Sequence, residues 1–64
     1  MQIFIERTNE NKTIDFKGTA EQLCTLLKIN PQTVLILKDG ELVTEDEELT
    51  NTNEIKLLTV VSGG

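Results

Sequence analysis

The fold is decided by residues 19–43, which read TAEQLCTLLKINPQTVLILKDGELV. Between residues 19 and 28, apolar side chains recur at i, i+3, i+4 and i+7, which is the spacing of an amphipathic helix. Residues 33–38 then read TVLILK, a dense β-branched and aliphatic run that is typical of a strand. Asp39-Gly40 follows and favours a tight β-hairpin turn. The stretch therefore predicts a helix, a strand and a hairpin in succession.

The predicted helix carries signals for both of its ends. Thr19 followed by Gln22 has the spacing of a capping box at the N-terminus. Lys28 lies where the helix dipole favours a positive charge, and Asn30-Pro31 is expected to stop the helix. We therefore predict one helix from Thr19 to Lys28.

The residues before the helix alternate as strands do. Residues 2–8 (QIFIERT) predict a first strand with Ile3 and Ile5 on one face. Residues 9–11 supply turn residues, and residues 12–17 (KTIDFK) alternate again with Ile14 and Phe16 on the apolar face. The sequence therefore begins with a predicted hairpin.

The residues after the second hairpin complete the predicted fold. Residues 44–53 are polar and acidic around one apolar anchor, Leu49, and residues 54–61 (EIKLLTVV) predict the last strand. Strands on both sides of one helix imply a sheet packed on one face, so we expect an α+β fold in which a mixed sheet of four to five strands packs on one helix. The predicted core consists of Ile3, Ile5, Ile14, Phe16, Leu23, Cys24, Leu27, Ile36, Ile55 and Leu57.

Length and composition exclude several classes of function. With 64 residues the chain has room for one small domain, and 38% hydrophobic residues let that domain fold alone. There is no His and only one Cys, so Ser/His/Asp catalysis, Cys/His catalysis and a multi-ligand zinc site cannot be assembled. We therefore expect no catalytic residues, no metal and no bound cofactor.

The charge balance bears on partners and location. Eleven acidic and six basic side chains give a net charge of −5, which repels nucleic acids and anionic membranes. No apolar run approaches the length of a membrane span, and the N-terminus has no signal-peptide pattern. One thiol makes no internal disulfide, which favours a reducing compartment. We expect a cytoplasmic monomer that binds neither nucleic acid nor membrane.

Four segments resemble one known family. Residues 30–43 (NPQTVLILKDGELV), the opening MQIF with the later KTI, and the terminal residues 57–64 (LLTVVSGG) are similar to ubiquitin-like β-grasp proteins. The short members resemble the chain most: the thiamine-pathway sulfur carrier, the small subunit of molybdopterin synthase and the small archaeal modifier proteins. The resemblance covers the whole chain. It implies a β-grasp domain at residues 1–61 and a flexible Ser-Gly-Gly tail at residues 62–64.

The resemblance also implies what the tail does. A separate ubiquitin-activating-type adenylating enzyme would use ATP to activate the carboxylate of Gly64, and Gly63 and Gly64 lack the Cβ that would crowd a narrow channel. A sulfur donor could then form a terminal thiocarboxylate for transfer to a sulfur acceptor, or a lysine of a target protein could form an isopeptide bond. By this interpretation the chain is a carrier or modifier, and thus a substrate of enzymes. In the alternative interpretation, residues 62–64 are a frayed chain end without a function.

A second candidate site lies on the sheet face away from the helix. If Ile3, Ile5, Ile55 and Leu57 face the helix, five apolar residues are left facing outward. This predicted partner-binding patch consists of Phe4, Leu35, Leu37, Leu58 and Val60. Strands buried on both faces, or reversed faces, would remove the patch. A noncovalent interaction module that uses this face is the alternative function.

The remaining reactive side chains have simpler interpretations. Cys24 lies in the apolar stripe of the predicted helix, so we interpret it as a buried core residue and not as a nucleophile. The acidic run Glu45–Glu48 lacks the spacing of a calcium loop and is expected to be a solvated turn. No lysine stands out as a conjugation site.

Overall fold

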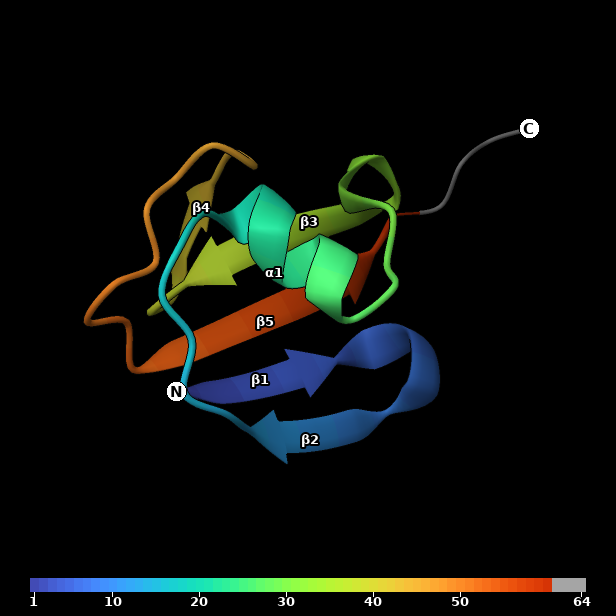
Figure 1. Cartoon of the computed structure of the whole chain (residues 1–64). Helices are drawn as coiled ribbons and strands as arrows, with labels where there is room; N and C mark the ends of the chain where they lie inside the picture. The colour runs from blue at the N-terminus through green and yellow to red at the C-terminus, as the bar shows by residue number, and fades with distance from the viewer. Residues whose placement is uncertain (61–64) are drawn as a thin grey trace.

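One α-helix lies across a five-stranded sheet in the computed structural model, which describes residues 1–60 (Figure 1). The strand order is β2-β1-β5-β3-β4; β1 and β5 run parallel, and the other neighbours run antiparallel. This mixed sheet confirms the predicted α+β fold, with five strands. The elements are β1 (Gln2–Ile5), β2 (Glu10–Thr13), α1 (Ala20–Leu26), β3 (Val34–Lys38), β4 (Glu41–Val43) and β5 (Glu54–Thr59), with short 3-10 helices η1 (Glu6–Thr8) and η2 (Pro31–Thr33).

The core lies between α1 and the three central strands. Ile3 pairs with Ile55, and Leu57 is the partner of both Ile5 and Ile36, so these side chains point to the same face. Leu49 joins them from the long loop with 0% of its surface exposed, as expected for an anchor. The buried apolar residues are Ile3, Ile5, Ala20, Leu23, Cys24, Val34, Ile36, Leu49, Ile55 and Leu57. The half-buried Ile14, Phe16 and Leu27 pack against them.

The helix begins as predicted, but the prediction of its end is wrong. Thr19 and Gln22 form a complete capping box, with a bond of 3.0 Å from the Thr19 amide to Gln22 Oε1. At the other end, Ile29 N–H donates to the Cys24 carbonyl at 2.8 Å and Lys28 adopts a left-handed φ of 60°. This is a Schellman turn, which stops the helix before Asn30-Pro31 is reached. Within residues 1–60, no helix has the length and apolar character needed to cross a bilayer.

The second strand also departs from the prediction. It runs from Glu10 to Thr13 and is exposed throughout. It begins at Glu10 because η1 makes the turn and the left-handed Asn9 closes it. Thr13 pairs with Gln2, where β1 begins. Past this pair, the Ile14 amide still donates to the Met1 carbonyl at 3.0 Å, but β1 has no further residue for β2 to pair with. Ile14 and Phe16 therefore lie in the connection to α1 and not in a strand, although both pack against the core.

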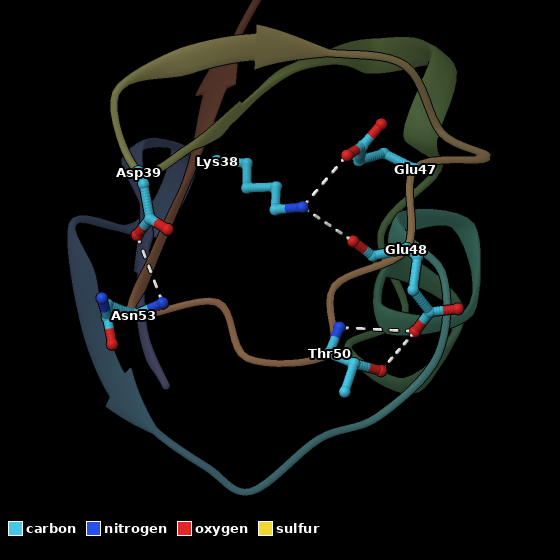
Figure 2. A network of polar contacts seen from close by, with 6 residues as sticks. All are labelled: Lys38, Asp39, Glu47, Glu48, Thr50 and Asn53. Atoms are coloured by element: carbon cyan, nitrogen blue, oxygen red, sulfur yellow. Dashed lines mark hydrogen bonds and ion pairs between the residues drawn. The ribbon is translucent and has the colours of Figure 1, made fainter.

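Polar contacts tie the long loop 44–53 to the sheet (Figure 2). Lys38 Nζ lies 3.0 Å from Glu47 Oε2 and donates to the Glu48 carbonyl at 2.9 Å. Asp39 Oδ1 accepts the amides of Asn53 at 3.2 Å and Glu54 at 2.8 Å. The loop is thereby held on both sides of Leu49, beside the hairpin of β3 and β4, which keeps Leu49 in the core.

Replacing Leu23 by Ala should lower the free energy of unfolding by about 2–5 kcal/mol, because it deletes a fully buried side chain and leaves a cavity. Leu26→Ala is the matched control, since Leu26 lies on the same helix with 59% of its surface exposed. We expect the control to lose under about 1 kcal/mol in urea-induced unfolding. Equal losses in the two variants would show that the helix faces the sheet through a different stripe.

Candidate functional site

The chain leaves the sheet at a fixed point between β1 and β3. The Val60 amide donates to the Thr33 carbonyl at 3.2 Å, and the Thr59 amide donates to Glu6 Oε1 at 2.9 Å. Glu6 was not singled out by the sequence analysis, because the contact joins residues that are 53 positions apart. The predicted tail at 62–64, with Gly63 and Gly64, lies outside the described residues. The two bonds hold Thr59 and Val60, the last described residues, against the sheet.

A shallow cavity opens beside this exit. Its volume is about 280 Å³, and its lining combines the end of β5, the start of β3 and the turn after β1. The lining residues are Arg7, Gln32, Thr33, Val34, Thr59 and Val60. Val60, one of the residues predicted for the partner patch, is half-buried at this cavity. It therefore belongs to the surroundings of the exit more than to the middle of the sheet face.

The strand register brings together the other four residues of the predicted patch. Phe4 is the partner of Lys56, and Lys56 is in turn the partner of Leu37 on the other side of β5. Leu35 and Leu58 form the adjacent pair. Because neighbouring strand positions alternate, all of these side chains point away from α1. Leu35 is 45% exposed, and Phe4, Leu37 and Leu58 are half-buried.

The same face holds one apolar residue that the sequence analysis missed. Leu42 in β4 is the partner of Leu37 and is 61% exposed. Leu42 and Val43 are neighbours in the strand that follows the Asp39-Gly40 turn, so their side chains must point to opposite faces of the sheet. Because Val43 packs against the core, Leu42 points outward. We define the outer patch as Phe4, Leu35, Leu37, Leu42 and Leu58.

Cys24 is fully buried in α1, with 0% of its surface exposed. Burial raises the pKa of the Cys24 thiol, and the nearby Glu45 carboxylate raises it further. A raised thiol pKa disfavours the thiolate, which is the nucleophilic form. The geometry therefore fits a structural role for Cys24 in the core.

The acidic run is engaged in local hydrogen bonds. Glu48 Oε1 accepts from both the amide and the hydroxyl of Thr50. The hydroxyl bond is the main reason that the pKa of the Glu48 carboxyl lies below its usual value. In residues 1–60, no three His, Cys, Asp or Glu side chains are grouped to hold a metal ion. In this structure, the contacts of the acidic run hold the long loop 44–53 in place.

The comparisons with known proteins decide the family. Residues 4–64 match the model of the ThiS family, which is almost the whole chain. The chain belongs to the ThiS family. Among curated proteins, the sulfur carrier protein TtuB of Thermus thermophilus is 30% identical over 60 residues, which cover 91% of this chain and 92% of that protein. ThiS membership, the TtuB similarity and the mixed sheet on one helix confirm the prediction of a ubiquitin-like β-grasp protein of the sulfur-carrier type.

Replacing Glu6 by Ala should speed hydrogen exchange of the Thr59 amide in this ThiS-family chain by roughly fivefold, about 1 kcal/mol, because the amide loses its side-chain acceptor. Glu6→Gln keeps an Oε1 acceptor and should restore most of the protection. Glu41→Ala, which removes an exposed carboxylate on β4, serves as the control. Unchanged exchange at Thr59 in the Glu6→Ala variant would mean that Glu6 does not hold the exit.

Proposed function

We propose that this chain is a sulfur carrier whose Gly64 carboxylate is activated by a separate ATP-dependent adenylating enzyme. The observation that carries the proposal is the family match, which extends through the Ser62-Gly63-Gly64 tail. The similarity to a curated sulfur carrier supports it over almost the full length of both proteins. The fixed exit at Thr59 and Val60 supports it too, because a held starting point limits the positions that a short tail can reach.

The proposed chemistry proceeds in two substitutions. A Gly64 carboxylate oxygen attacks the α-phosphorus of ATP, and pyrophosphate leaves to give an acyl-adenylate. A hydrosulfide ion then attacks the acyl carbon, and AMP leaves to give the thiocarboxylate. The chain supplies only the acyl group, so the adenylating enzyme must supply the positioning and the charge stabilisation. The product thiocarboxylate would pass its sulfur to an acceptor protein.

A second outcome of the same activation is conjugation. The ε-amine of a lysine on a target protein could attack the acyl-adenylate instead of hydrosulfide, with AMP leaving and an isopeptide bond forming. Both outcomes need the same activated Gly64, so the carrier and modifier interpretations share their first step.

We also propose that the adenylating enzyme binds this chain through the outer patch. The patch lies on the sheet face that α1 does not cover, and two of its leucines are largely exposed. A cluster of exposed and half-exposed apolar side chains on a small protein is a common sign of a protein interface. The exit of the chain lies at the end of β5, the strand that also carries Leu58. An enzyme seated on this face would therefore contact the strand that leads into the tail.

The tail proposal predicts the effect of changing Gly64. With ATP, magnesium, sulfide and the adenylating enzyme of the same organism, intact mass should show one oxygen of the wild-type chain replaced by sulfur. Gly64→Ala should slow adenylation by roughly tenfold or more, because a Cβ obstructs the approach to the α-phosphate. A chain extended past Gly64 should not react. If the extended chain is adenylated as fast as the wild type, the noncovalent interaction module becomes the better account.

The patch proposal predicts that an aspartate lowers adenylation at Leu35 but not at Leu26, although both leucines are exposed. Leu35→Asp should lower kcat/KM for adenylation by roughly tenfold or more, because it places a charge inside an apolar interface. Leu26→Asp makes the same change on the helix, on the other side of the sheet, and should leave kcat/KM within about twofold of wild type. Circular dichroism would check that both variants are folded. Equal activity of the two variants would remove the outer patch from the interface.

A further inference from the structure

One charged residue stands in the middle of the outer patch. Lys56 is exposed and lies in β5 between Phe4 on β1 and Leu37 on β3. Leu58 follows on the same face of β5, two residues along the strand. A partner surface that covers Phe4, Leu37 and Leu58 would therefore also meet Lys56. We propose that the partner surface seated on the outer patch presents a carboxylate to Lys56; this inference rests on the proposed function.

Lys56 differs from the other basic residues of the chain in its surroundings. Lys38 is already paired with Glu47 at 3.0 Å, and Lys12 lies 3.7 Å from Glu10. Among the described residues, Lys56 has no ion pair, and neither do Arg7, Lys17 and Lys28, so its place on the sheet is what distinguishes it. It is the one basic side chain on the outer sheet face of residues 1–60. The others lie in turns and connecting segments or on the opposite face: Arg7, Lys12, Lys17, Lys28 and Lys38.

The charge of Lys56 would have a large effect on binding affinity if a partner buried it. Covering an ammonium group with an apolar surface removes its water without replacing the hydrogen bonds, which is strongly unfavourable. A carboxylate at the same place restores those bonds and adds attraction in a site of low dielectric constant. Phe4, Leu37 and Leu58 border Lys56 on three sides and would also exclude competing water from the pair. On the fourth side, Glu54 lies two residues earlier on the same face of β5. The outer patch therefore suits an acidic side chain surrounded by apolar groups, and it disfavours a purely apolar partner.

The distinguishing experiment changes Lys56 in three ways and follows adenylation by pyrophosphate release, with the adenylating enzyme of the same organism as the probe. Lys56→Glu should raise KM by at least about 30-fold with little change in kcat, because two carboxylates would then meet. Lys56→Met should raise KM by at least roughly tenfold, since it leaves the partner carboxylate unpaired. Lys56→Arg keeps the charge and should stay within about fivefold of wild type.

Lys12→Glu is the matched control, because it makes the same change in net charge at an exposed lysine outside the patch. Its KM should stay within about threefold of wild type. Lys56→Met separates the two kinds of partner, because a purely apolar surface would bind this variant as tightly as wild type or more tightly. That result, or equal effects of Lys56→Glu and Lys12→Glu, would overturn the inference while leaving the proposed function intact. If the wild-type chain itself is not adenylated, the proposed function fails, and the inference fails with it.

Discussion

The pairing of β5 between β1 and β3 is the constraint on which the rest of this structure depends. It joins the two ends of the sequence, since β1 starts at Gln2 and β5 ends at Thr59. Because β1 and β5 run parallel, the chain between them must cross over, and α1 lies within that crossover. The same pairing buries Ile55 and Leu57 against the helix. The core, the outer patch and the exit of the chain all follow from the position of one strand.

The loop before β5 supplies one residue that completes the small aliphatic core. Leu49 is inserted from a stretch that is otherwise polar, and Lys38 and Asp39 hold the loop on either side of it. The Glu45 and Glu47 carbonyls accept the first amides of α1, so the loop also caps the helix. In a domain of this size, where one core leaves little spare stability, each such contact matters.

Short-range patterns in the sequence allowed most of the fold to be predicted. Most of the features that were missed depend on contacts between residues that are far apart in the sequence. The capping box is readable because Thr19 and Gln22 are neighbours on one turn of the helix. The end of α1 was missed because Lys28 takes a conformation that usually indicates glycine. The exposed β2, the contact of Glu6 with Thr59 and the central place of Lys56 all depend on which strands pair and in what register. Alternation within one strand cannot supply that register.

The central proposal for this protein is that the Gly64 end of the chain carries sulfur. The most direct test is the intact mass of the protein purified from its own cells under conditions that preserve thiocarboxylates, followed by fragmentation of its C-terminal peptide. We predict a population in which one oxygen is replaced by sulfur and the change maps to Gly64. This population should be lost on treatment with an alkylating reagent, which converts the thioacid to a thioester. A C-terminal peptide found only as the ordinary carboxylate, in cells that are actively assembling thiolated products, would contradict the proposal.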